Sequence, residues 1–190
     1  AVYEDPNDPD GYYNLAATYH RLGTLNQRPS DLKQAEHYYR MCLDRAPEHR
    51  SCYRGLAVLM AEQNKAEEGF ALVRGWVDRN PAAPEPKIEL ARLYEEFGDR
   101  QTAKDYLVNA LTIDPENAQA LAALGRLREE TGEHAQALAD YERSLRSDQF
   151  QEGVRQRVAA LRSKLGTSTT INPTPPGGTR VVTGPPNTLR

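Results

Sequence analysis

The sequence lacks the short motifs by which most enzymes and metalloproteins are recognised. It contains no Gly-rich phosphate-binding loop, no HExxH, no GxSxG and no CxxC, and each of these motifs places reactive or ligating groups at a fixed spacing. The histidines have no ligand spacing, so we expect surface or partly packed side chains. They are His20, His37, His49 and His134. We therefore expect no catalytic residues, no metal site and no cofactor.

Charge of one sign and long apolar runs are also scarce. The chain carries 24 Lys and Arg against 27 Asp and Glu, a formal charge of −3. This balance gives no sign of a surface for nucleic acid or membrane. The longest clear apolar run, Leu56 to Ala61, is far shorter than the roughly 18 residues that a membrane helix needs. We expect no nucleic-acid partner and no membrane span within this sequence.

The stretch from Pro84 to Pro115 shows the organisation that the rest of the chain repeats. Apolar and small residues recur there at spacings of three and four in two segments, with Gly98 and Asp99 between them, which is the pattern of amphipathic helices. Pro115 ends the second segment, because proline lacks the N–H donor and disfavours helix at the preceding residue. The stretch therefore predicts a helical hairpin.

The same hairpin recurs along the chain. Pro47, Pro81 and Pro115 stand 34 residues apart, and Gln149 occupies the next such position. Small residues fall in register with them in the second helices, at Ala35, Gly69, Ala103 and Ala137. This period and this pattern of residue types resemble those of the tetratricopeptide repeat (TPR) family. The resemblance implies an all-α fold, a right-handed α-solenoid of about four TPR helical hairpins with a C-terminal capping helix and an extended Pro/Thr/Gly-rich tail.

The register also predicts the domain boundaries. Residues 9–166 form the TPR domain, and residues 1–8 are either the end of a preceding repeat or an ordinary lead-in. The tail, residues 167–190, is rich in Thr, Pro and Gly and cannot bury a core of its own. Within the domain we expect repeats at residues 9–47, 50–81, 84–115 and 118–149, followed by a capping helix at residues 151–165.

Two repeats depart from the common pattern. The first carries seven extra residues, 24–30, which we place in the turn between its helices, with Ser30 as the N-cap of the second helix. Tolerance of this insertion is favoured over a role in recognition, because the entropy of loop closure rises slowly with length. In the second repeat Trp76 replaces a small residue. We expect a core side chain there rather than a platform for a ligand.

The only cysteines are Cys42 and Cys52. The resemblance places one late in a second helix and the other at the start of the next first helix, elements that pack together in TPR proteins. A disulfide between them is therefore one alternative. Reduced, buried thiols are the favoured prediction, because two cysteines in a helical domain are ordinary.

The resemblance also gives a candidate binding site. In TPR arrays the first helix of each hairpin lines a concave groove that typically holds an extended peptide or a partner's helix. The corresponding positions here are Tyr13, Ala17, His20, Arg54, Val58, Ile88, Glu89, Arg92, Arg126 and Glu129. The arginines could pair with a guest's carboxylates, phosphates or carbonyl groups, or equally with glutamates inside the groove. The chain does not match the Lys, Asn and Arg positions of the chaperone-tail carboxylate clamp.

The resemblance implies a non-catalytic protein–protein interaction scaffold or adaptor that binds a peptide or partner segment in its concave groove. One alternative is an accessory TPR portion of a larger enzyme or envelope-assembly machine. Another is self-association, with the tail of one copy in the groove of a second copy. The sequence does not identify the partner, the pathway or the compartment.

Overall fold

The structure, a computed structural model, describes residues 7–166. The predicted tail and most of the predicted lead-in lie outside the described residues. Within the described part the chain forms nine helices and no strand. They are α1 (Pro9–Asn26), α2 (Pro29–Arg45), α3 (Arg50–Glu62), α4 (Ala66–Arg79), α5 (Glu85–Glu96), α6 (Arg100–Ile113), α7 (Ala118–Glu130), α8 (His134–Ser147) and α9 (Glu152–Lys164).

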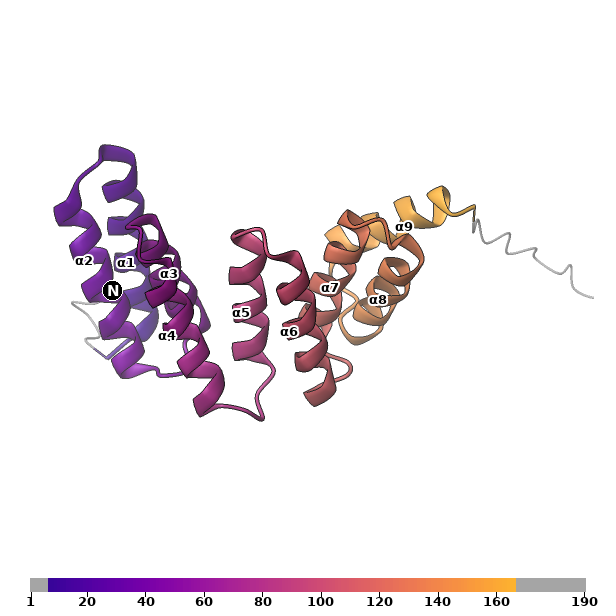
Figure 1. The fold of residues 1–190 in the computed structure, drawn as a ribbon, viewed down its shortest axis with the longest axis horizontal. Coiled ribbons are helices and arrows are strands. Elements are labelled where there is room, and N and C mark those ends of the chain that lie inside the picture. The colour runs from indigo at the N-terminus through magenta and orange to yellow at the C-terminus, as the bar shows by residue number, and fades with distance from the viewer. Residues whose placement is uncertain (1–6, 167–190) are drawn as a thin grey trace, which may run out of the picture.

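The helices pack as successive antiparallel hairpins in one curved row, from α1 and α2 at one end to α9 at the other (Figure 1). Each hairpin is a pair of consecutive helices, and the second helix of each pair also contacts the first helix of the next. The first helices contact one another as well, α1 with α3 and α3 with α5. They form an inner layer, and the second helices form an outer layer. The predicted all-α solenoid is confirmed.

Local sequence signals explain where the helices begin and end. The side chains of Asp8, Asp99 and Asn117 accept backbone N–H bonds from the first turns of α1, α6 and α7, each at 3.0 Å, which satisfies donors that have no partner inside the helix. Gly98, between α5 and α6, has φ of +85°, a conformation that only glycine adopts freely. Helix α6 ends at Ile113, shortly before Pro115.

Each cluster of buried side chains joins a helix or hairpin to the helix that follows it. One cluster spans α1, α2 and α3, the next spans α3, α4 and α5, a third spans α5, α6 and α7, and the last joins α8 to α9. Small residues allow this close packing. A Cβ atom at Gly69 in α4 would lie 2.7 Å from the carbonyl oxygen of Ala57 in α3.

The first hairpin differs from the prediction. Its extra residues lengthen both helices, to 18 residues in α1 and 17 in α2, and leave only Gln27 and Arg28 between them. Helix α2 begins at Pro29, so Ser30 is its second residue and not its N-cap. The predicted cap is wrong because proline, whose fixed φ and missing N–H suit the first helical position, starts the helix two residues earlier than we placed it.

The two cysteines also differ from the prediction. Cys42 in α2 and Cys52 in α3 form a disulfide, with their Cα atoms 6.5 Å apart. Reduced thiols were the favoured prediction, and the structure corrects it. The sequence could place the two residues on packed helices, but it could not give the distance between them. The bridge fastens the first hairpin to the second.

Trp76 is a core residue, as predicted. Its side chain is 1% exposed and its ring stacks on the ring of Tyr53 in α3, with centroids 4.4 Å apart and an interplanar angle of 4°. Its Nε1–H donates to Glu48 Oε2 at 2.7 Å, so the polar atom of the ring is satisfied. The ring therefore ties α4 to α3 and to the turn before α3.

Helix α9 covers the last hairpin. Val158 and Leu161 are 6% and 2% exposed and pack with Ala137 and Tyr141 of α8. The helix ends at Lys164, and Gly166 has φ of +67°, the left-handed conformation common just after a helix C-terminus.

Candidate binding groove

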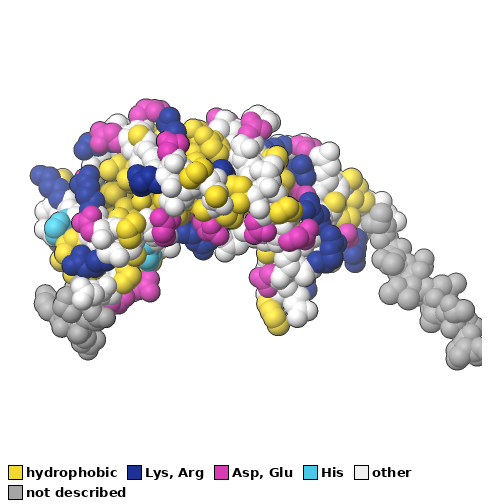
Figure 2. All heavy atoms as spheres, turned by 90° about the horizontal axis from the view of Figure 1, so that it is seen from below, with side chains coloured by type: hydrophobic (Ala, Val, Ile, Leu, Met, Phe, Trp, Pro, Cys, Tyr) yellow, Lys and Arg dark blue, Asp and Glu magenta, His cyan; other side chains and the backbone are white. Residues whose placement is uncertain are grey.

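Three adjoining hollows follow one another along the inner layer. The first lies between α1, α3 and α5, the second between α3, α5 and α7, and the third between α5, α7, α8 and α9. Arg92 in α5 lines all three. We refer to the residues that line these hollows as the groove. Figure 2 shows the molecule as an arch, with acidic and basic side chains close together along its hollowed edge.

Most of the predicted site residues lie together in the groove. Seven of the ten line it, namely Tyr13, His20, Arg54, Val58, Glu89, Arg92 and Arg126. Ala17 and Glu129 are half-buried on the same inner helices but are not among the lining residues.

Ile88 is the exception, because it is completely buried. It packs against Ala91, Leu107 and Leu124 in the core between α5, α6 and α7. The prediction that Ile88 anchors a guest in the groove is therefore wrong. Ile88 lies three residues before Ala91 on α5, and this spacing puts both on the core-facing stripe of the helix.

The groove arginines have partners inside the groove. Arg92 Nη1 lies 2.9 Å from Glu89 Oε1, and Glu89 is only 4% exposed. Arg54 Nη2 in α3 lies 3.6 Å from Glu96 Oε2 in α5, and both side chains are nearly half exposed. Internal pairing was one of the two interpretations that the sequence left open, and in this structure the arginines follow it.

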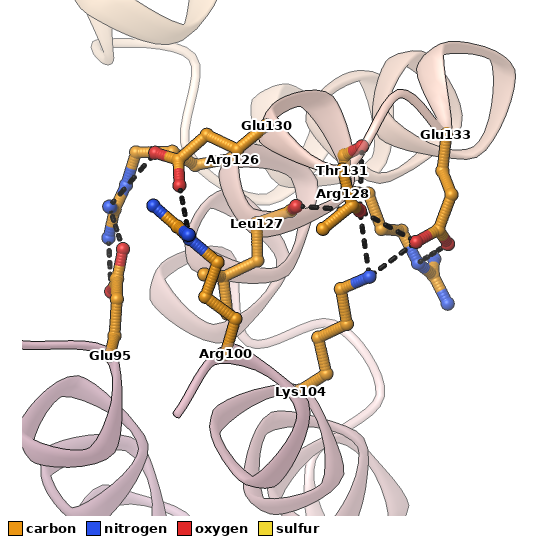
Figure 3. Close-up of polar contacts among 9 residues, drawn as sticks. All are labelled: Glu95, Arg100, Lys104, Arg126, Leu127, Arg128, Glu130, Thr131 and Glu133. Atoms are coloured by element: carbon orange, nitrogen blue, oxygen red, sulfur yellow. Dashed lines mark hydrogen bonds and ion pairs between the residues drawn. The ribbon is translucent and has the colours of Figure 1, made fainter. Parts of the chain in front are cut away.

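Arg126 makes the strongest of these contacts. Both of its terminal nitrogens donate to the carboxylate of Glu95, the second at 2.8 Å, and a longer contact of 3.9 Å reaches Glu130 (Figure 3). The hydrogen bond with Glu95 raises the pKa of the Arg126 guanidinium above its ordinary value. Beside it, Arg100 Nε lies 3.2 Å from Glu130 Oε2. These pairs connect α5 and the start of α6 with α7 along the groove.

His20 also has its contacts within the protein. Its Nε2 lies 3.0 Å from Glu62 Oε2 at the end of α3, and its Nδ1 lies 3.4 Å from the hydroxyl of Tyr39. Thr24 donates to the same Glu62 oxygen at 3.2 Å. Burial raises the pKa of the Tyr39 hydroxyl, so this group remains protonated. The His20 side chain thus holds α1 against α3 at one rim of the groove.

Several groove residues escaped the sequence analysis. Arg50 at the start of α3 donates through Nη1 to Gln119 Oε1 of α7 at 2.7 Å, so this pair spans the groove. Helix α9 and the turn before it contribute Gln151, Val154 and Arg157 to the third hollow. The sequence does contain a signal for these residues, because the 34-residue period continues: Gln151 stands 34 residues after Asn117, the N-cap of α7. Continuing the period by one step would have marked α9 as a further inner helix.

The fold and groove together define a class, the α-solenoid repeat proteins that offer an extended concave surface to other proteins. Tetratricopeptide repeat profiles match residues 27–84 and 88–152, and a second tetratricopeptide repeat profile matches residues 1–28. The chain belongs to the tetratricopeptide repeat family.

Relatives and solved structures agree with this assignment. The chain is 25% identical over 146 residues to a DnaJ homolog subfamily C member 7 homolog of Schizosaccharomyces pombe, covering 72% of this chain but only 31% of that protein. It is similar in fold to the thermophilic TPR protein TTC0263 of Thermus thermophilus (TM-score 0.62, 23% identity, 84% of both chains). It is also similar to the first TPR of Spaghetti (RPAP3) bound to an HSP90 peptide (TM-score 0.54, 17% identity, 62% of this chain and 95% of that one).

Proposed function

We propose that this chain is a non-catalytic scaffold whose groove binds an extended segment of another protein. The observation that carries the proposal is the continuity of the groove, since the same arginine, Arg92, borders all three hollows from α1 to α9. A groove of this length suits a strand-like or helical segment better than a small ligand. The peptide bound to the first TPR of Spaghetti supports the same use of the fold.

The chemistry of the groove favours a guest with carboxylate or carbonyl oxygens. Arg54 and Arg126 are 47% and 42% exposed although both are paired. The Arg54–Glu96 pair is exposed on both sides, and exposed ion pairs contribute little to stability, so exchanging Glu96 for a guest's oxygen costs little. Tyr13 and Val58 supply apolar contacts in the first hollow. The guest would therefore combine acidic or backbone oxygens with an apolar side chain near α1 and α3.

The proposal is tested by charge reversal with a matched control. One bait carries Arg54→Glu, Arg92→Glu and Arg126→Glu in the groove. The control bait carries Arg40→Glu, Arg74→Glu and Arg143→Glu on the outer helices α2, α4 and α8, where each arginine is also paired with a glutamate and partly exposed. Both baits change the net charge equally, so a non-specific electrostatic effect would appear in both.

We expect a partner captured by the unchanged chain to lose at least tenfold in affinity with the groove bait and to stay within about twofold with the control, measured by calorimetry on the purified pair. Equal affinity for both baits would move recognition away from the groove. Because Arg92→Glu places a second carboxylate beside the buried Glu89, the helicity of each bait is compared first. Arg54→Glu alone then repeats the test at an exposed pair.

A further inference from the structure

A cluster of possible metal ligands lies outside the groove, at the junction of the first two hairpins. The sulfur atoms of Cys42 and Cys52 and one ring nitrogen of His49 all lie within 4.8 Å of one another. Both cysteines are 0% exposed, and the His49 side chain is 15% exposed. Two sulfurs and an imidazole at this spacing are the donor set that thiophilic divalent cations prefer.

The hydrogen bonds of His49 fix its tautomer in the form that a metal ligand needs. The backbone N–H of Cys52 donates to His49 Nδ1 at 3.2 Å, so Nδ1 carries no proton. The proton is therefore on Nε2, which lies 3.0 Å from Asp10 Oδ1 and donates to it. Histidine ligands in metal sites usually donate their outer N–H to a carboxylate in this way. The lone pair of Nδ1 accepts the Cys52 N–H in this structure, so a cation at Nδ1 would replace that capping hydrogen bond.

Capping alone does not explain a histidine at this position. His49 is the N-cap of α3, and the corresponding caps of α1 and α7 are Asp8 and Asn117. Asp and Asn are among the best N-cap residues, and histidine is not among the preferred ones. The ring of His49 also contacts the ring of Tyr13, with centroids 5.6 Å apart. That contact leaves Nδ1 directed at the first turn of α3, where Cys52 lies.

We propose that, once the Cys42–Cys52 disulfide is reduced, both thiolates and His49 Nδ1 bind one thiophilic divalent cation, and Zn²⁺ is the cation whose chemistry suits these ligands best. Zinc–sulfur bonds of about 2.3 Å in a tetrahedral site separate two sulfurs by about 3.8 Å, so the cation and the disulfide exclude one another. The Cα atoms, 6.5 Å apart, need not separate for the side chains to rotate. A water molecule would complete four ligands, as in other zinc sites with three protein ligands.

The chemistry balances with a phosphine or a thiol as reductant. A phosphine and one water molecule reduce the disulfide to two thiols, and the phosphine leaves as its oxide. The cation then displaces both thiol protons, which pass to solvent. A small disulfide reverses the process, since the two thiolates form the Cys42–Cys52 bond, the oxidant takes two protons from solvent and becomes two thiols, and the cation is released. The junction between the first two hairpins is thus held by a covalent bond in one state and by a cation in the other.

The test uses the full chain and Co²⁺ as the probe, because thiolate-bound cobalt gives a sulfur-to-metal charge-transfer band. The protein is purified with a phosphine throughout, and a second portion is oxidised with a small disulfide. We expect the reduced chain to take up one Co²⁺, which one equivalent of Zn²⁺ displaces, and the oxidised chain to show no band. A reduced chain without the band would overturn the proposal.

Variants separate ligation from structure. His49→Asn keeps an N-cap acceptor for α3 but removes the imidazole, and we expect at least tenfold weaker cobalt binding at unchanged helicity. His37→Asn, at an exposed histidine of α2, should leave the affinity unchanged. Asp10→Ala removes only the outer partner of His49 and should weaken binding about tenfold. Cobalt affinity equal to that of the unchanged chain in His49→Asn would show that histidine is no ligand and contradict the proposal.

Discussion

The two halves of the solenoid join their hairpins by different means. From α1 to α4 the buried contacts are rich in aromatic rings, and a disulfide links the two hairpins. From α5 to α7 the buried residues between hairpins are Ala, Leu and Ile, with the partly buried Tyr94 and Tyr106 packed against them. There, ion pairs such as Lys104 with Glu133, Arg100 with Glu130 and Arg126 with Glu95 connect the two hairpins (Figure 3).

This difference has a physical consequence. Aromatic stacking and a covalent bond depend little on ionic strength, whereas partly exposed ion pairs weaken with salt and with protonation of the carboxylate. The same helical hairpin can therefore be joined by contacts that respond to different conditions. We expect the N-terminal junction to respond to the size of buried rings and to redox state, and the C-terminal junction to respond to charge.

The largest effect is expected for Trp76→Ala in the N-terminal half. The substitution removes a ring that is 1% exposed, its stacking on Tyr53 and the hydrogen bond to Glu48. We expect a loss of about 3–5 kcal/mol in the free energy of unfolding, measured by urea denaturation followed by circular dichroism. Phe150→Ala is the matched control, because that ring is 83% exposed, and it should cost less than about 0.5 kcal/mol. An unchanged free energy of unfolding for Trp76→Ala would show that the ring contributes nothing to the core.

The C-terminal half should instead be sensitive to a buried charge. Arg128 Nη1 in α7 lies 2.6 Å from Asp140 Oδ2 in α8, and Asp140 is 4% exposed. Burial raises the pKa of the Asp140 carboxyl, and the positive charge of Arg128 opposes that rise. Arg128→Met should cost about 1–3 kcal/mol, because it leaves a buried carboxyl without its partner.

A double variant separates the loss of the charge pair from the loss of packing. Arg128→Met together with Asp140→Leu removes both charges, and we expect it to recover most of the stability lost in the single variant, again measured by urea denaturation. If the double variant is no more stable than Arg128→Met alone, the cost of the single change lies in the packing of the arginine stem and not in the unpaired carboxyl.

Periodicity predicted the fold well because it depends on local spacing. The proline register placed the helices, because it follows from repeats of 3.6 and 34 residues. The resemblance to TPR arrays then placed seven groove residues on the inner helices. The pairing of Arg92 with Glu89 follows from their spacing of three residues on one helix, whereas the pairs that join different hairpins do not follow from local spacing. Arg126 meets Glu95, which is 31 residues earlier in the chain, and that contact depends on the angle between hairpins. The disulfide escaped prediction for the same reason, since it depends on how α2 meets α3.

The smallest expected effect is an acid-dependent one at Glu133, in the turn between α7 and α8. Lys104 and Thr131 donate to its carboxylate (Figure 3), and these bonds hold the pKa of Glu133 below its ordinary value of 4.5. A carboxyl whose pKa is lower in the folded state stabilises the fold while it is ionised. That stabilisation is present above pH 4.5 and is lost as the pH falls through the lower pKa of the folded state.

Glu133→Gln isolates this contribution. At pH 7 the variant should be slightly less stable than the unchanged chain, and the two should converge once the pH has fallen below the lowered pKa of the folded state, where the carboxyl is protonated in both the folded and the unfolded state. Glu67→Gln in α4 is the control, since Glu67 is 90% exposed in its pair with Arg74 and should give almost no difference at either pH. A gap between Glu133→Gln and the unchanged chain that persists at low pH would come from packing or hydrogen bonding of the neutral group. The C-terminal junction would then depend on shape, as the N-terminal one does.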